Sequence, residues 1–255
     1  RSLPTVNPLV FECNDGFLND IQRMAVTPQH YLQAFDAADE AVVSGAVGAG
    51  RGMSCFELKG GIGTASRRVM LRGGAGYTVG ALVLANFGKL AQLRIDGHAV
   101  GERLAAATPD DAPEQGSIIL LLATDAPLDA RQLRRLALRA GAGLARTGSV
   151  FGHGSGDIAL AFSTAYTVPQ AADAPMPAVA MLHDGLLDQW FQAAADGSEQ
   201  AIYDALWQAH AVTGRDGHRR DALADSLKGW TSLSPAAPSL LARAAGLVRR
   251  FRSSE

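Results

Sequence analysis

Residues 112–128 read APEQGSIILLLATDAPL and place a small pair, Gly116 and Ser117, at the entrance of an apolar strand. The residues just upstream are acidic and turn-forming, which predicts an exposed loop over Thr108–Gln115. The run Ser117–Thr124 is short and almost uniformly apolar, which is typical of a buried strand. A loop that ends in Gly-Ser has two explanations. Either the loop simply enters the strand there, or the chain is cut between Gly116 and Ser117.

Strand-like and helix-like segments lie on both sides of this strand. Thr27 and Pro28 favour a helix start, because threonine caps well and proline suits the first helical turn. We expect strands at Leu9–Cys13, within 53–101 and at Ile158–Tyr166, and helices at Thr27–Val42, Leu128–Arg146 and His183–Val212, the last with a polar interruption near Gly197. A loosely packed tail with one helix from Ser239 would follow. This pattern predicts layered α+β packing.

Composition limits the classes of function. The chain has 255 residues, 47% of them hydrophobic, and a formal charge of −2, so it lacks the basic patch of a nucleic-acid-binding protein. Its longest apolar run, Ile118–Ala123, is too short to cross a membrane. The cysteines, Cys13 and Cys55, form no disulfide framework and predict buried, reduced thiols. We expect a cytoplasmic location. Because the sequence starts at Arg1 rather than Met, a removed leader and a periplasmic location stay open.

Several common chemistries have no motif here. The sequence contains no GxGxxG or P-loop, no HExxH and no GxSxG elbow, so we expect no metal and no cofactor. What remains is a set of small polar clusters at Gly60–Thr64, Asn86, Gly116–Ser117 and His153–Asp157. Each of them alone is typical of a turn, a bulge or a loop.

Six segments together carry more information than any single cluster. They read ECNDGFLNDI (12–21), CFELKGGIGTASR (55–67), YTVGALVLANFG (77–88), GSIILLLATDAPL (116–128), RTGSVFGHGSGDIALAFST (146–164) and TGRDGH (213–218). Through their order and spacing the chain resembles the self-processing serine aminopeptidases of the DmpA type. This family includes L-aminopeptidase/D-Ala-esterase/amidase and the β-peptidyl aminopeptidases. The resemblance covers Val6 to about His218.

The resemblance implies a fold and a processing event. The family fold is an αββα sandwich similar to that of N-terminal nucleophile hydrolases, here as a single domain over residues 1–255. Cleavage between Gly116 and Ser117 would give an α-chain part, 1–116, and a β chain, 117–255, which stay associated. Relatives are longer at the N-terminus, so we expect an early part of the α chain to lie outside this sequence. We also expect a homo-oligomer, tetramer-like, of αβ units.

The resemblance also implies roles for particular residues. Ser117 matches the nucleophile, and its freed α-amine, with an ordinary pKa of about 7.7–8.0, would act as the base that a serine hydroxyl needs. Ser155 matches a hydrogen-bond relay to that amine or hydroxyl, and Asp157 the acid that orients it. Asn86 matches the asparagine that stabilises the oxyanion. Asn14 stands where some relatives have a tyrosine, so it is a possible oxyanion or substrate contact.

Three functions remain open at this point. The first is an aminopeptidase, amidase or esterase that releases an N-terminal L-, D- or β-residue from short peptides, amides or esters. The second is an acyltransferase similar to ornithine acetyltransferase, which uses a threonine nucleophile. Serine at position 117 favours the hydrolase. The third is an inactive fragment or assembly subunit that keeps the fold. None of the three implies a nucleic-acid or membrane partner.

Overall fold

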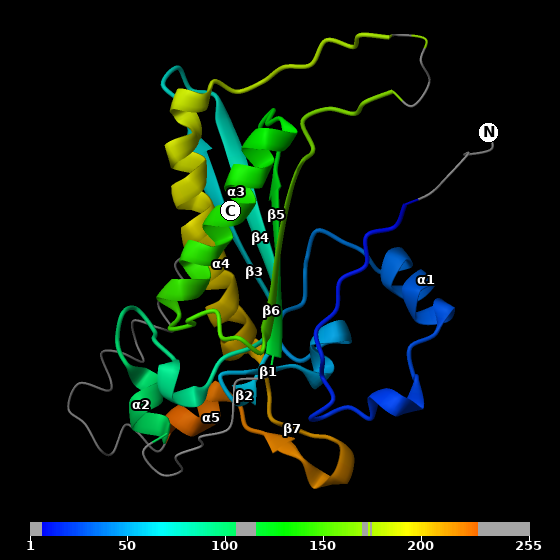
Figure 1. The fold of residues 1–255 in the computed structure, drawn as a ribbon, viewed down its shortest axis with the longest axis vertical. Helices are drawn as coiled ribbons and strands as arrows, with labels where there is room; N and C mark the ends of the chain where they lie inside the picture. Colours follow the sequence, from blue (N-terminus) through cyan, green and yellow to red (C-terminus); the bar gives the residue numbers. More distant parts are fainter. Residues whose placement is uncertain (1–6, 106–115, 170–172, 174, 229–255) are drawn as a thin grey trace.

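The structure, a computed structural model, describes residues 7–105, 116–169, 173 and 175–228. Within them the chain forms one four-stranded sheet and two pairs of short strands (Figure 1). The strands are β1 (Ser54–Cys55), β2 (Leu58–Lys59), β3 (Gly61–Met70), β4 (Gly76–Asn86), β5 (Gly116–Thr124), β6 (Ser155–Ser163), β7 (Val212–Thr213) and β8 (Arg219–Arg220). The α-helices are α1 (Pro28–Asp36), α2 (Val100–Ala105), α3 (Ala130–Arg146), α4 (Leu187–Gln208) and α5 (Leu223–Lys228), and short 3-10 helices connect several of these elements.

The large sheet has the strand order β3-β4-β5-β6, so β5 lies between β4 and β6. The pairs β3–β4 and β4–β5 are antiparallel, whereas β5 and β6 are parallel. Parallel neighbours need a crossover connection, and α3 lies in the one that joins β5 to β6. This topology brings the first residues of β5 and β6 together at the same end of the sheet as the last residue of β4.

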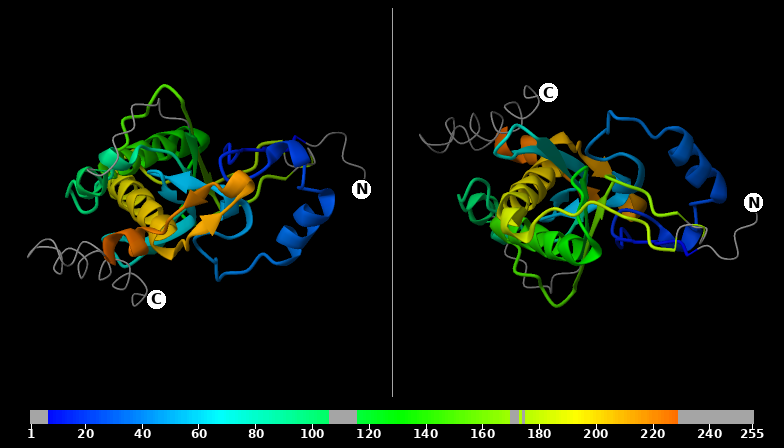
Figure 2. Two further views of the ribbon diagram at one scale, coloured as in Figure 1. Left: turned by 90° about the horizontal axis from the view of Figure 1, so that it is seen from below. Right: turned by 90° about the horizontal axis from the view of Figure 1, so that it is seen from above.

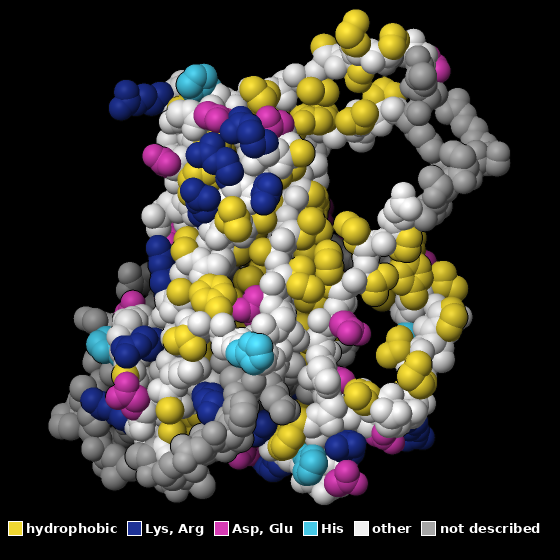
Figure 3. Space-filling view, viewed as in Figure 1, with side chains coloured by type: hydrophobic (Ala, Val, Ile, Leu, Met, Phe, Trp, Pro, Cys, Tyr) yellow, Lys and Arg dark blue, Asp and Glu magenta, His cyan; other side chains and the backbone are white. Residues whose placement is uncertain are grey.

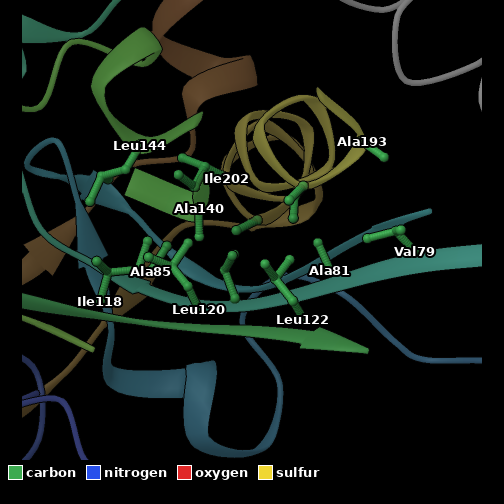
Figure 4. Packing of buried hydrophobic residues seen from close by; sticks show 14 of the residues in the cluster. Val79, Ala81, Ala85, Ile118, Leu120, Leu122, Ala140, Leu144, Ala193 and Ile202 are labelled. Carbon is green, nitrogen blue, oxygen red and sulfur yellow. The ribbon is translucent and has the colours of Figure 1, made fainter. Parts of the chain in front are cut away.

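Helices α3 and α4 cover one face of the sheet (Figure 2). Ile118, Leu120 and Leu122 point from β5 into this layer and are at most 2% exposed (Figure 4). Asp129 caps α3, because its carboxylate accepts a hydrogen bond from the Gln132 backbone amide at 2.6 Å. The fit between helix and sheet is close and apolar, which makes this face the main core.

The opposite face of the sheet, here called the open face, is only partly covered. Phe162 on β6 is 44% exposed, and a cavity of about 600 Å³ is lined by Thr64, Leu82, Leu121 and Phe162, among others. The segment that carries α1 stands beside this face in two perpendicular views (Figures 1 and 2). Figure 3 shows apolar side chains along the hollow between them. Helix α1 itself buries no residue.

Glycine is required where α4 meets β3. A Cβ atom on Gly63 would collide with the backbone carbonyl oxygen of Ala201 in α4. This close approach lets the helix lie directly on the strand. The glycine block Gly60–Thr64 therefore has an architectural role at this position.

Most strongly patterned segments form the elements that the sequence predicts. The strand at Ser117–Thr124 is confirmed as β5, and the helices at Leu128–Arg146 and His183–Val212 as α3 and α4. Helix α4 continues through Gly197, whose predicted interruption is wrong. The strand predicted at Ile158–Tyr166 begins three residues earlier, at Ser155.

Two predictions in the first part of the chain are corrected. Leu9–Cys13 forms no strand, because Leu9 and Val10 are 73% and 83% exposed and find no strand partner among the described residues. The helix that starts at Pro28 ends at Asp36 rather than continuing to Val42. Phe11 and Cys13 still pack against Met53, Leu84 and Ile119, whereas Leu9, Val10 and the apolar residues of α1 stay exposed.

The remaining predictions concern the loop before β5, the C-terminal tail, the cysteines and a membrane-spanning helix. The loop at Thr108–Gln115 and the tail helix from Ser239 lie outside the described residues. Neither cysteine forms a disulfide within the described residues; Cys55 is buried and Cys13 is only partly buried. Among the described residues, no helix combines the length and the apolar character needed to cross a membrane.

Candidate active site

Ser117 and Asn86 lie side by side on the open face. In the register of the sheet, Ser117 on β5 is paired with Asn86 on β4 and with Gly156 on β6. Directly opposed residues of antiparallel strands have Cβ atoms about 4.5–5.5 Å apart and point to the same face. Both side chains are nearly buried, with Ser117 8% and Asn86 5% exposed. The topology therefore places an amide group beside the Ser117 hydroxyl.

The Asn86 side chain is held from two sides. Its Oδ1 accepts a hydrogen bond from the Ser54 backbone amide at 2.8 Å, and its Nδ2 donates to the Asn14 carbonyl oxygen at 2.9 Å. These two partners determine which end of the amide is oxygen and which is nitrogen. Since Nδ2 carries two hydrogens, one N–H can still be donated to a group bound beside Ser117.

Asn14 contacts this site through its backbone. Its side-chain Oδ1 accepts a hydrogen bond from the Gly16 amide at 2.9 Å, as in an Asx turn. Its carbonyl oxygen is the group that Asn86 reaches. Asn14 therefore shapes the loop that closes this end of the sheet, and the geometry gives its side chain a turn role.

Ser155 and Asp157 form a second pair on β6. The Ser155 hydroxyl donates to Asp157 Oδ1 at 2.7 Å. Because side chains alternate along a strand, both point to the face opposite that of Gly156 and hence of Ser117. The register places Ser155 beside Gly116. The pair thus lies next to the Gly116–Ser117 peptide bond, and within the described residues no hydrogen bond joins it to the Ser117 hydroxyl.

Gly116 occupies a position where a side chain does not fit. A Cβ atom there would collide with the backbone oxygen of Asn86. The Gly116 amide also donates to the carbonyl oxygen of Gly154 at 3.2 Å, which ties it to the turn before β6. The predicted cleavage bond is therefore held between β4 and β6 by backbone contacts.

Two further residues near this site were not predicted from the sequence to lie there. The Cys13 thiol lies 3.6 Å from the Ser117 carbonyl oxygen, and burial raises its pKa, although a hydrogen bond with the Ser117 side chain acts in the opposite direction. Lys59 is fully buried and donates to the carbonyl oxygens of Gly50, Met53 and Gly60 at 2.6–2.8 Å. Burial lowers the pKa of Lys59 to about 8. A single lysine inside a glycine-rich block was the signal that could have identified it.

Metal chemistry has no candidate site in the described part of the chain. No group of three or more His, Cys, Asp or Glu side chains comes together there in an arrangement that could hold a metal ion.

Comparison with known proteins identifies the family. The sequence model of Peptidase family S58 matches residues 1–220. Beta-peptidyl aminopeptidase BapA from Sphingosinicella microcystinivorans is 45% identical over 226 residues, which cover 83% of this chain and 57% of that protein. The chain therefore spans little more than half the length of this curated relative.

Two solved structures share the fold. The PH0078 protein from Pyrococcus horikoshii OT3 has a TM-score of 0.80 at 47% identity, over 89% of this chain and 64% of that one. The L-aminopeptidase D-Ala-esterase/amidase from Ochrobactrum anthropi has a TM-score of 0.75 at 39% identity, over 86% and 62%. The latter is described as a prototype of the serine aminopeptidases and a variant of the N-terminal nucleophile hydrolase fold. This confirms the predicted fold class, an α+β sandwich of that type, and the chain belongs to peptidase family S58.

Proposed function

We propose that this chain forms the catalytic centre of a self-activating hydrolase that releases N-terminal residues from short peptides, amides or esters. The observation that carries the proposal is the row of Asn86 and Ser117 across β4 and β5, with the Ser155–Asp157 pair beside the Gly116–Ser117 bond. Relatives described as a β-peptidyl aminopeptidase and as an L-aminopeptidase and D-Ala-esterase/amidase support this class of reaction.

The first step is self-cleavage. The Ser117 hydroxyl oxygen attacks the Gly116 carbonyl carbon, the C–N bond breaks, and the nitrogen takes up the proton that the hydroxyl releases, which makes it the new α-amine. Water then hydrolyses the resulting ester, which leaves a Gly116 carboxylate and restores the hydroxyl. The absence of a side chain at Gly116 supports this step, because a Cβ atom there would collide with the backbone oxygen of Asn86 beside the bond to be cut.

The second step is turnover of substrate. The freed α-amine of Ser117 takes the proton of the hydroxyl as this attacks the substrate carbonyl, and then gives it to the leaving amine. Water, deprotonated by the same α-amine, next attacks the Ser117 ester, which releases the product acid and restores the hydroxyl. The position of Ser155 and Asp157 next to Gly116 favours the amine, rather than the hydroxyl, as the group that they contact. A carboxylate near the amine stabilises its protonated form.

Asn86 would stabilise the oxyanion of the tetrahedral intermediate. Its amide is fixed by Ser54 and Asn14, so its remaining N–H is oriented before substrate binds. Such preorganised donors are effective because they need no rearrangement as charge develops.

Substrate range, assembly and compartment are part of the same proposal. The names of the relatives support N-terminal L-, D- or β-residues as substrates. The open face, with Phe162 exposed, is consistent with further packing in an oligomer of αβ units. Cys13 and Cys55 are not joined in a disulfide, which supports a reducing, cytoplasmic location.

An intact-mass spectrum of the native protein, followed by a panel of aminoacyl 4-nitroanilides, tests the proposal. We expect two polypeptides, of which the second begins Ser-Ile-Ile-Leu, and release of 4-nitroaniline. An active preparation that contains only the uncut chain would contradict the mechanism. Cut protein that transfers acyl groups to ornithine but hydrolyses no amide would favour the acyltransferase instead.

A further inference from the structure

We propose that Arg220 is a positioning residue for Asn86. It connects the two backbone segments between which the Asn86 amide is held. The inference rests on the proposed function, in which Asn86 stabilises the oxyanion, and assigns a role to the C-terminal hairpin β7–β8 that the mechanism above does not use.

The first connection runs through Ser54. The Arg220 Nε donates a hydrogen bond to the Ser54 hydroxyl at 3.2 Å. The backbone amide of the same serine donates to Asn86 Oδ1 at 2.8 Å. Arg220 is therefore one residue away from the group that orients the oxygen end of the Asn86 amide.

The second connection runs through Phe17. The guanidinium carbon of Arg220 lies 3.8 Å from the centre of the Phe17 ring, as in a cation–π contact. Phe17 follows the turn in which Asn14 accepts the hydrogen bond from Asn86 Nδ2. The ring also stacks on His218, whose Nδ1 lies 2.8 Å from the Phe17 carbonyl oxygen. The loop that orients the nitrogen end of the amide is thus attached to the same arginine.

The hairpin itself is anchored. Arg220 is paired with Val212 in β7, and the Arg215 amide donates to the Leu18 carbonyl oxygen at 2.8 Å. A planar guanidinium can stack on a ring and donate in its own plane at the same time, whereas a lysine ammonium cannot do both. These contacts make the TGRDGH segment a support for the loops around Asn86.

Loss of Arg220 should affect catalysis more than substrate binding. Without Arg220, Ser54 and Asn14 would each be free to shift, and the Asn86 N–H would lose its fixed direction. A displacement of about 1 Å at a catalytic group can cost on the order of 100-fold in rate. We therefore expect kcat to fall while KM changes little, because the donor matters mainly in the transition state.

The test compares Arg220→Ala and Arg220→Lys with the matched control Arg219→Ala. Arg219 is the neighbouring arginine; its side chain is 56% exposed, and it pairs with Asp221 at 2.7 Å. With the best 4-nitroanilide of the panel, we expect a loss of kcat of roughly 10- to 100-fold for both Arg220 variants and none for the control. Equal kcat values for Arg220→Lys, Arg219→Ala and the parent protein would overturn the inference.

A double mutant separates positioning from a general structural effect. If Arg220 acts through Asn86, then Arg220→Ala causes no further loss in an Asn86→Ala protein. A loss of the same factor in both backgrounds would refute the inference while leaving the proposed function intact. Wild-type turnover of Asn86→Ala alone would instead refute the role of Asn86 in the proposed function.

Variants of the two contacts guard against failure of Arg220→Ala to fold. Ser54→Ala removes the acceptor of Nε but keeps the backbone amide, and Phe17→Leu removes the ring but keeps the turn. Each is expected to lower kcat by a few-fold, and this loss should disappear in the Asn86→Ala background. Unchanged kcat in both variants would count against the inference.

Discussion

The two faces of the large sheet differ in how their side chains are covered. On the face toward α3 and α4, Leu122 and Trp190 have no exposed surface. On the open face, Ile158 and Phe162 are 36% and 44% exposed. The candidate nucleophile Ser117 lies on the open face, yet it is only 8% exposed. The helix-covered face is therefore the packed core of the domain, whereas the open face carries the candidate site.

The end of the open face that carries Ser117 is covered by loops instead of helices. Residues near Cys13 and Ser54 close over it through hydrogen bonds that involve main-chain groups. Phe11, Cys13 and Met53 also pack there against Leu84 and Ile119. Loops can supply polar groups to a site, whereas the helical layer supplies rigidity. A rigid strand below and polar loops above give Ser117 a fixed place next to a donor.

The largest expected effect is that of Ser117→Ala. Because one hydroxyl would perform both self-cleavage and turnover, the variant should remain a single chain and lose all amide hydrolysis. Stability should be almost unchanged, since the helix-covered face is not altered. Gel electrophoresis and the 4-nitroanilide assay measure the two outcomes, and a cut Ser117→Ala chain would show that another group performs the cleavage.

Asn86→Ala should have the next largest effect on activity. Loss of one oxyanion donor typically lowers the rate about 10²–10³-fold. The variant should still fold, which circular dichroism can verify, because the helix-covered core is untouched. Steady-state kinetics on folded protein decide the question, and a loss below 10-fold would remove Asn86 from the proposed mechanism.

Substitution of two neighbouring leucines of β5 compares how much each face of the sheet contributes to stability. Leu122→Ala, on the helix-covered face, should lower the free energy of unfolding by about 2–5 kcal/mol. Leu121→Ala, on the partly exposed open face, should lower it by about 1 kcal/mol. Denaturant unfolding of both variants measures the difference. Equal losses would mean that the open face is covered as completely as the other in the native protein.

The smallest expected effect is a change of pH dependence in Asp157→Asn. A carboxylate near the freed amine favours the protonated form, so its removal should lower the pKa of that amine. More of the amine is then the free base at low pH, and the acid limb of the kcat/KM profile should move down by roughly 1 pH unit. A profile that overlays that of the parent would leave Asp157 with a structural role only.

The sequence predicted the elements with strong patterns and failed where packing decides. Helix α3 and strand β5 were found within one or two residues, because their apolar periodicity is strong and their ends carry turn or capping residues. Leu9–Cys13 has the composition of a strand but no partner in the sheet among the described residues. Strand formation depends on a neighbour, which local sequence does not report.

The residues of the candidate site could be predicted from the sequence, but their arrangement could not. Order and spacing of sequence blocks were enough to predict the family and to select Ser117, Asn86, Ser155 and Asp157 as candidates. They could not show that Ser155 and Asp157 point to the face opposite Ser117, because that depends on the register between β5 and β6.

Features that depend on residues close together in the sequence were determined by the sequence alone. They are the apolar strand that begins at Gly-Ser, the amphipathic helix, and the two cysteines without a disulfide framework. Contacts between distant segments depend on how those elements pack, and only the tertiary structure decided them. The Asn86 amide between Ser54 and Asn14, and Arg220 in contact with Ser54 and Phe17, join residues up to 203 positions apart. The physical reason is that a hydrogen bond or a ring contact requires a direction and a distance, and neither exists until the chain has folded.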